Sequence, residues 1–229
     1  MEAMASSKKV TNRDEWEKML SGVSVRKEHM NKIVMNFLVT EGYLDAAEKF
    51  QLESSTEPGV DLATGIDRMA VKKALQGGYV EDAIGKVNDL NPEILDTNAE
   101  LFFHLQKQQL IELIRNGKVE EALDFAGEEL APRGEENKKF LEELERAVTL
   151  LAFEDASKSP VAELLDMLQR VKIASEVNAV ILTSQGQEKD PKLLNLLKML
   201  VWTQKELDAK AGYPRMNDLS TAVLEDPPV

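Results

Sequence analysis

The sequence predicts an all-α protein. Apolar residues make up 43% of the chain, aromatic residues only 5%, and glycine and proline number 12 and 8. This composition is typical of an ordered helical protein rather than a β-sandwich or a disordered chain. A hinge motif also recurs three times, as Gly42-Tyr43-Leu44-Asp45-Ala46-Ala47, Gly78-Tyr79-Val80-Glu81-Asp82-Ala83 and Gly117-Lys118-Val119-Glu120-Glu121-Ala122.

Each hinge is predicted to join two helices. Glycine tolerates the left-handed conformation that ends a helix, and the acidic residues favour the N-terminus of the next one. Gly42, Gly78 and Gly117 are separated by 36 and 39 residues. We therefore expect successive αα-hairpins, which build surfaces rather than a catalytic cleft.

Charge and composition exclude several kinds of partner, covalent link and location. The formal net charge of -13 disfavours nonspecific binding to nucleic acid or to an anionic membrane. The chain contains no cysteine, so disulfides and thiolate metal sites are excluded. Residues 1–9 lack the apolar region of a signal peptide, and no segment approaches the length of a membrane span. We expect a cytoplasmic and nuclear protein.

The N-terminal part of the chain is predicted to contain a tail, a short helix and a hairpin. Residues 1–10 carry no apolar pattern, and Thr11 followed by Asp14 resembles a capping box. From position 26 onward, helical spacing and the break at Gly42 predict an αα-hairpin of about 30 residues, too small to bury a core alone. Its apolar stripe consists of Met30, Ile33, Val34, Phe37, Leu38, Leu44, Ala47 and Phe50.

The middle of the chain is predicted to be a helical bundle. Residues 54–65 are interpreted as a loop, and helices resume from Ile66 with a break at Gly77-Gly78. Asn91 is expected to cap a helix that has Pro92 in its first turn. The helix over 101–114 is apolar around well over half of its circumference, so we expect it to be buried on several sides.

The C-terminal part continues this pattern. We expect a loop over 132–136, an amphipathic helix over 140–153, and another helix starting at Ser159-Pro160. Residues 186–190 are interpreted as a connector, and Asp190-Pro191 is expected to open a last long helix with two apolar faces. Residues 216–229 show little pattern and are interpreted as a tail.

The first hairpin resembles a LisH motif. The resemblance covers about residues 26–54 and rests on Ile33-Val34-Met35-Asn36-Phe37-Leu38, Gly42-Tyr43, Ala47, Phe50 and Glu53. LisH hairpins are dimerisation modules, so the resemblance implies an interface. Its predicted residues are Ile33, Val34, Phe37, Leu38, Tyr43, Ala47 and Phe50. Spacing alone leaves an ordinary intramolecular core equally open for this stripe.

Residues 75–125 are similar to the CTLH motif that directly follows LisH in one family, and residues 116–213 resemble the CRA region that completes the set. The chain is thus identified as a member of the LisH-CTLH-CRA family, whose members build the GID/CTLH (glucose-induced degradation) E3 ubiquitin ligase complex. It resembles a small scaffold subunit of that family, since short tails are its only other parts. The expected ranges are 1–25 for the N-terminal tail and short helix, 26–58 for LisH, 64–122 for CTLH, 117–215 for CRA and 216–229 for the C-terminal tail.

The resemblance also implies further interfaces and partners. The last CRA helices are expected to pack back near LisH, so the two ends of the chain should meet. A CTLH/CRA interface is expected at Phe102, Phe103, Leu110 and Leu113, and a C-terminal CRA interface at Leu193, Leu194, Leu197, Leu200, Val201 and Trp202. The implied partners are RING-containing, SPRY-containing and armadillo-repeat subunits, with a homodimer as an open alternative.

A search for catalytic or metal-binding patterns yields no candidate site. His29 and His104 are the two histidines, and we interpret His29 as a surface residue and His104 as a hydrogen-bonded core or interface residue. Adjacent acidic pairs such as Glu142-Glu143 diverge by about 100° on a helix, which is typical of a solvated face. No nucleotide-binding, serine-hydrolase or zinc-protease motif occurs. No catalytic, metal or cofactor-binding residue is predicted.

Three functions remain open. The leading hypothesis is a noncatalytic scaffold of a GID/CTLH-type ligase that links its RING subunits to its substrate-receptor arm. The second is a self-standing LisH homodimer that acts as an adaptor without ubiquitin transfer. The third and weakest is a small hydrolase that uses the acidic clusters.

Overall fold

The computed structural model describes residues 9–227, apart from the side chains of Lys9 and Thr64. The expected all-α class is confirmed, because helices account for most of the described chain and strands occur only as two-residue segments. The chain divides into two compact units. The terminal unit comprises the described residues up to Phe37, Phe50–Glu57 and those from Asp190 onward, and the central unit comprises Leu38–Lys49 and Pro58–Lys189.

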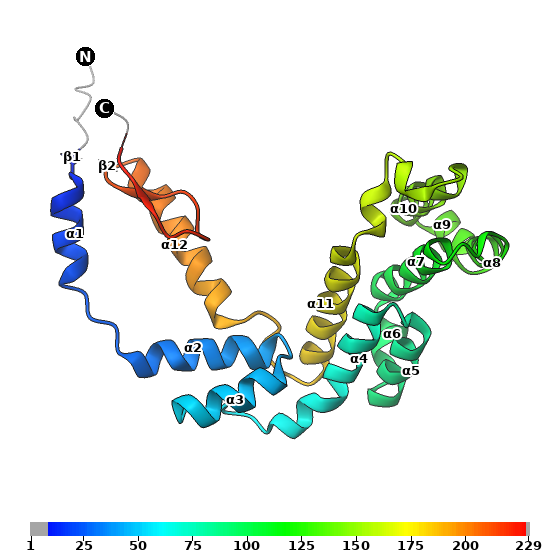
Figure 1. Cartoon of the computed structure of the whole chain (residues 1–229), viewed down its shortest axis with the longest axis horizontal. Helices are drawn as coiled ribbons and strands as arrows, with labels where there is room; N and C mark the ends of the chain where they lie inside the picture. Colours follow the sequence, from blue (N-terminus) through cyan, green and yellow to red (C-terminus); the bar gives the residue numbers. More distant parts are fainter. Residues whose placement is uncertain (1–8, 228–229) are drawn as a thin grey trace, which may run out of the picture. The chain divides into compact units, whose positions relative to one another are not determined.

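The terminal unit joins the two ends of the chain (Figure 1). It contains α1 (Arg13–Ser21), most of α2 (Lys27–Thr40), the end of α3 (Leu44–Ser54), α12 (Lys192–Asp208) and the short strands β1 (Lys9–Val10), β2 (Ala211–Gly212), β3 (Arg215–Met216) and β4 (Leu224–Glu225). β1 pairs in parallel with β2, and β3 pairs in antiparallel with β4. The expectation that the chain ends meet is confirmed.

The N-terminal segment differs from the prediction in two respects. Lys9–Val10 is a paired strand rather than a tail, while the rest of the predicted tail lies outside the described residues. The backbone N–H of Thr11 donates to Gly212 O at 2.8 Å, so Thr11 still belongs to the extended segment. The helix cap is therefore Asn12, whose side chain accepts the backbone N–H of Glu15 at 2.9 Å. The predicted cap at Thr11 was wrong by one residue.

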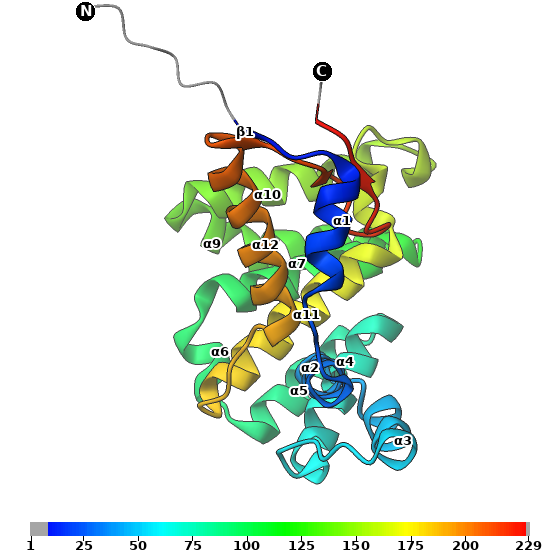
Figure 2. The same ribbon diagram turned by 90° about the vertical axis from the view of Figure 1, so that its left-hand side faces the viewer.

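The central unit is built mainly from helical hairpins (Figure 2). Its helices are α4 (Ile66–Gly77), α5 (Val80–Leu90), α6 (Glu93–Thr97), α7 (Ala99–Arg115), α8 (Val119–Phe125), α9 (Ala131–Glu136), α10 (Lys138–Val148) and α11 (Met167–Ser184). Single turns of 3-10 helix occur at Leu62–Gly65, Thr149–Ala152, Ala156–Lys158 and Ala162–Leu165, and a π-helical turn occurs at Ala126–Leu130.

Helix α7 takes part in two hydrophobic cores. Leu101 and Leu105 pack into a core with residues of α4, α5 and α11. Phe103 and Leu110 pack into a second core with α8 and α10, where the Phe103 ring stacks on Phe140 with centroids 4.2 Å apart. The prediction that this helix is buried on several sides is confirmed.

Three boundaries in the C-terminal half were predicted incorrectly. The expected loop at 132–136 is part of α9, because proline is tolerated in the first turn of a helix, where its missing N–H has no partner to lose. The helix expected over 140–153 starts at Lys138 and changes to a 3-10 turn at Thr149. The helix expected at Ser159-Pro160 is only a short turn, and the long helix α11 begins at Met167.

The three hinge glycines have the left-handed conformation expected of them, with φ of 77° at Gly42, 83° at Gly78 and 71° at Gly117. Gly78 is restricted in a second way. A Cβ atom there would lie 2.6 Å from Nη2 of Arg170, whose guanidinium binds the carboxylate of Glu112. The hinge between α4 and α5 therefore requires glycine, because any other residue would strain the backbone and clash with Arg170.

Gly78→Ala is expected to lower the free energy of unfolding by about 1–3 kcal/mol, because it combines a disfavoured backbone conformation with a steric clash. Gly85→Ala is the matched control, since Gly85 lies within α5 and a Cβ there meets no atom within 4 Å. The control is expected to raise stability by about 0.5–1 kcal/mol. Urea unfolding measures both, and equal stability of the two variants would contradict the assigned hinge.

Candidate protein-interaction surfaces

The C-terminal end of α2 is held by buried polar side chains of α4 and α11. Arg68 donates to Val39 O at 3.0 Å and to Thr40 O at 3.2 Å. Asn178 donates to the same Thr40 O at 2.9 Å and accepts a bond from Arg68 at 2.6 Å. The last carbonyl groups of a helix lack the usual partner four residues on. Val39 O also accepts the backbone N–H of Gly42 at 3.1 Å, whereas the buried Thr40 O is satisfied by Arg68 and Asn178.

Lys72 extends this contact to the hinge. Its ammonium group donates to Glu41 O and lies 4.1 Å from the centroid of the Tyr43 ring. Arg68 and Lys72 are only 3% and 6% exposed, and burial lowers the pKa of both. The negative end of the α2 dipole favours both cations in this position. We call Arg68, Lys72 and Asn178 the α2 clamp.

The predicted LisH interface residues differ in their exposure. Ala47 is completely buried within the chain and presents no surface, so its assignment as an interface residue was wrong. Its backbone N–H closes the first turn of α3 by donating to Tyr43 O at 2.9 Å. Val34 and Tyr43 are exposed, and the half-buried residues of the set are Ile33, Phe37, Leu38 and Phe50.

The terminal unit buries few of its apolar side chains. Helix α1 has no buried residue, and Gln204 is the one buried residue of α12. Met35 and Tyr213 are the large apolar side chains that the described part of this unit buries. Those that stay exposed in it include Met19, Leu20, Val34, Leu194, Leu196, Met199, Val201 and Trp202, while Leu193, Leu197 and Leu200 are half-buried. Exposed apolar surface on this scale is typical of an interaction site.

A polar network near Tyr213 joins α12 to the following segment. The Tyr213 hydroxyl lies 2.7 Å from Gln204 O and 3.0 Å from the Asp208 carboxylate. Arg215 in turn pairs with Asp208 at 2.6 Å. The ring of Tyr213 packs against Trp16 of α1, with centroids 5.3 Å apart. Burial, followed by the contact with Asp208, raises the pKa of Tyr213 to about 12.

The C-terminal hairpin continues this connection to α1. The Gln204 amide donates to Met216 O at 3.0 Å and accepts the Met216 N–H at 2.8 Å. Arg13 of α1 binds the carboxylate of Asp226 at 3.0 Å and Leu224 O at 2.8 Å. The segment expected to be a tail therefore forms β3 and β4, and we call residues 213–226 the C-terminal strap.

The start of α12 is also tied to α2. The backbone N–H of Lys192 donates to the side chain of Asn36 at 2.8 Å. A residue of the LisH hairpin thus caps the last long helix. Within the terminal unit, α12 is attached at its N-terminal end by Asn36 and at its C-terminal end by the network of Tyr213.

The predicted CTLH/CRA interface is partly wrong. Phe103 and Leu110 have no exposed surface and belong to the second core. The pattern misled because an apolar helix between two cores has the same spacing as one with an intermolecular face. Phe102 and Leu113 are half-buried, and the Arg133 guanidinium lies 4.7 Å from the centroid of the Phe102 ring.

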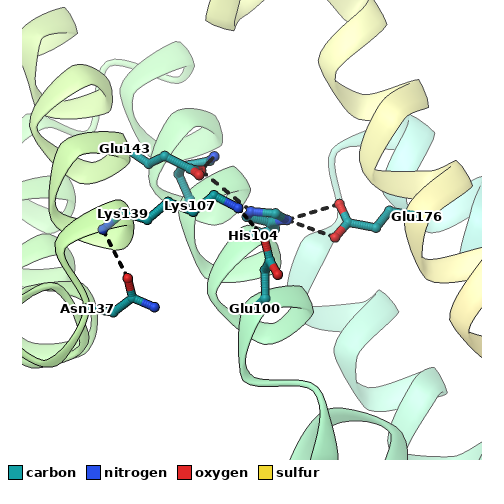
Figure 3. A network of polar contacts seen from close by, with 7 residues as sticks. All are labelled: Glu100, His104, Lys107, Asn137, Lys139, Glu143 and Glu176. Carbon is teal, nitrogen blue, oxygen red and sulfur yellow. Dashed lines mark hydrogen bonds and ion pairs between the residues drawn. The ribbon is translucent and has the colours of Figure 1, made fainter.

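His104 lies in a network of charged side chains (Figure 3). Its Nδ1 is 2.8 Å from the carboxylate of Glu176 on α11, and its Nε2 is 3.5 Å from Glu143 on α10. Burial raises the pKa of Glu143, but the hydrogen bond from Lys107 and the positive charges nearby together outweigh it, so the pKa is lowered. The interpretation of His104 as a hydrogen-bonded structural residue is confirmed.

The structure offers no metal centre in the part of the chain that it describes. No three histidine, aspartate or glutamate side chains gather there in a way that would hold an ion. His29 is exposed and contacts Arg26, as expected of a surface residue. A helix with the length and apolarity needed to cross a membrane is likewise not found among the described residues.

Comparison with known families defines the class of protein to which this chain belongs. The LisH family model matches residues 28–54, which contain most of α2 and all of α3. A second model, described as the CTLH/CRA domain C-terminal to the LisH motif, matches residues 65–208, from the start of α4 to the end of α12. Together these matches define a helical LisH-CTLH protein.

Curated relatives narrow this class. The chain is 72% identical to "Protein GID8 homolog" of Arabidopsis thaliana, an alignment that covers 99% of this chain and 93% of the relative. It is 57% identical to "Glucose-induced degradation protein 8 homolog" of Dictyostelium discoideum, over 96% of each chain. It is 36% identical to "GID complex subunit 8" of Schizosaccharomyces pombe, over 84% of this chain and 85% of the relative. The chain belongs to the GID8 family of LisH-CTLH proteins.

Arg68→Met is expected to lower the free energy of unfolding by about 1–3 kcal/mol, because the buried Oδ1 of Asn178 loses its donor and two buried carbonyl groups each lose one of their two hydrogen bonds. Lys73→Met is the matched control, since Lys73 is exposed and its ion pair with Asp45 is long, at 3.8 Å. The control is expected to change stability by no more than about 0.5 kcal/mol. Urea unfolding distinguishes them, and an Arg68→Met variant as stable as the control would contradict the α2 clamp.

The raised pKa of Tyr213 predicts a pH dependence. The folded state favours the neutral phenol, so its stabilising effect is complete below the ordinary pKa of 10.0 and is lost as the pH rises toward about 12. The difference between the tyrosinate absorbance titrations of the wild type and Tyr213→Phe isolates this group. We expect a midpoint near 12 in that difference, whereas a midpoint at 10.0 would show that the phenol is solvated.

Proposed function

We propose that this chain is a noncatalytic linker subunit of a GID/CTLH-type E3 ubiquitin ligase. The names of its relatives support this, since one is a GID complex subunit and others are glucose-induced degradation proteins. The chain links RING catalytic subunits to the substrate-receptor arm and so serves ubiquitin-dependent protein degradation. It works in the cytoplasm and nucleus.

The observation that carries this proposal is the uncovered apolar surface of the terminal unit. Trp202 and Met199 of α12 are 61% and 60% exposed, and Val34 of α2 is 41% exposed. Burial of apolar surface is the main driving force of association, at about 25 cal/mol per Å² removed from water. Exposed aromatic and methionine side chains are also enriched at the centres of protein interfaces. The LisH hairpin with α12 is thus the surface that binds another subunit.

The partners follow from the family. Another LisH-CTLH-CRA subunit carries a hairpin of the same kind and pairs with this surface, and the family also supplies SPRY-containing and armadillo-repeat subunits. This chain contains no cysteine, so it cannot form the cysteine-rich zinc site of a RING domain. The ligase activity therefore comes from RING-containing partners.

Phe37→Asp and Val34→Asp are expected to abolish co-purification of other LisH-CTLH subunits with the tagged chain. Each places an unpaired charge in an apolar contact. Val34→Asp complements Phe37→Asp, because Val34 is exposed and its substitution is expected to leave the fold intact. Leu168→Asp is the matched control, since Leu168 is 65% exposed on α11 of the central unit. Affinity purification with mass spectrometry, together with circular dichroism, measures both properties.

Each result of this experiment has a clear meaning. Recovery of RING-containing subunits with the wild type and with Leu168→Asp, but not with Val34→Asp, supports the linker. Recovery of the chain alone supports the self-standing LisH homodimer and contradicts the ligase assignment. Unchanged recovery with Val34→Asp contradicts the role of the LisH hairpin.

A further inference from the structure

The chain that leads from α1 into the LisH hairpin is exposed along its whole length (Figure 1). Every residue from 17 to 30 is exposed to solvent, and α1 has no buried residue. The exposed fractions of five apolar side chains in this segment lie between 48% and 66%: Met19, Leu20, Val23, Val25 and Met30. Residues 17–30, which we call the α1–α2 strip, therefore present apolar surface that the described part of the chain leaves uncovered.

The strip is attached to the rest of the terminal unit on both sides. Before it, Trp16 packs against Tyr213, and Arg13 binds the C-terminal strap. After it, Asn36 of α2 accepts the backbone N–H of Lys192. Within the described chain, the strip itself forms no hydrogen bond or ion pair with any segment other than α1 and α2. It is thus held in place between α2 and the segment that follows α12, although its own side chains stay uncovered.

A segment of this kind needs an external contact to keep a defined structure. Helix α1 contains nine residues, and isolated helices shorter than about 12–15 residues are only marginally stable in water. Helices in proteins gain most of their stability from the packing of an apolar face, and residues 17–21 are exposed on every side in the described chain. Burial of Met19 and Leu20 against a partner would supply the packing that this half of α1 lacks.

The position of the strip indicates which partner covers it. Met30 and Val34 are four residues apart in α2, so their side chains lie one above the other on the same face of the helix. Val34 belongs to the surface that we assign to LisH pairing, and Met30 is the last residue of the strip. A subunit that packs on Val34 therefore reaches Met30 and continues along the strip. This continuity of apolar surface favours a single occupant for both.

We propose that the strip is a second contact region for the subunit that pairs with the LisH hairpin, and that this subunit is another LisH-CTLH protein. This inference rests on the LisH pairing proposed above. An apolar helix of that subunit packs against Met19, Leu20 and Val23. The two family matches begin at residues 28 and 65, so most of the strip lies outside them. A contact outside the hairpin distinguishes between subunits whose LisH hairpins are alike, so the strip selects the partner.

Photo-crosslinking in the purified native assembly tests this inference. p-Benzoylphenylalanine replaces Leu20 in one variant and Val34 in another, where it reports LisH pairing itself. We expect both positions to crosslink to the same LisH-CTLH subunit. If position 34 crosslinks to that subunit and position 20 crosslinks to nothing, to a second copy of this chain or to another protein, the inference is overturned and LisH pairing stands. If neither position crosslinks to a LisH-CTLH subunit, LisH pairing is contradicted as well.

A charge placed in the strip provides the second part of the test. Leu20→Asp is expected to reduce the amount of the pairing subunit that co-purifies at least fivefold, on the order of 1 kcal/mol of binding free energy. Leu168→Asp makes the same change at an exposed residue of α11 in the central unit and is expected to leave that amount unchanged. Circular dichroism is expected to show equal helix content in both variants, because α1 buries no residue. Equal co-purification with the two variants overturns the inference, even where Val34→Asp abolishes pairing.

Discussion

The C-terminal end of α2 is the point on which the architecture depends. Its last carbonyl groups are buried and accept hydrogen bonds from Arg68 and Asn178, and Lys72 donates to Glu41 O in the turn that follows. Arg68 and Lys72 are almost completely buried, and no carboxylate of the described chain binds either of them directly. Burying these charges costs free energy, which the negative end of the α2 dipole and three carbonyl oxygens offset. This explains why residues 38–49, which belong to the LisH hairpin in sequence, are part of the central unit.

The two units differ in how they meet the entropy cost of folding. The central unit buries two apolar cores that share helix α7. The terminal unit depends instead on polar contacts among α1, α12 and the C-terminal strap, and a surface hydrogen bond or ion pair adds only about 1 kcal/mol or less to stability. A unit that is held mainly by polar contacts gains stability when a partner binds it and covers its exposed apolar side chains. This balance supports the proposed pairing of the terminal unit with another subunit.

Sequence reasoning succeeded where a structural requirement repeats along the chain. The hinge glycines and the all-round apolarity of α7 are local patterns, and both are found in the structure. It failed where one side chain makes one distant contact. Arg13 reaches Asp226, and Asn36 caps Lys192, but neither pair leaves a periodic signal. Gln204 offered a weak signal, as a polar residue in an apolar helix. Phe103 was misassigned because periodicity does not distinguish a core from an interface.

Hydrogen exchange tests the central claim, that the terminal unit completes its core in a partner, most directly. The isolated chain and the chain within its purified native assembly would be compared helix by helix. We expect amides of α1 and α12 to exchange rapidly in the isolated chain and to become protected at least tenfold in the assembly, while α4, α7 and α11 are protected equally in both. Equal protection of α12 in the two samples would show that its apolar face is not an interface and would contradict the account.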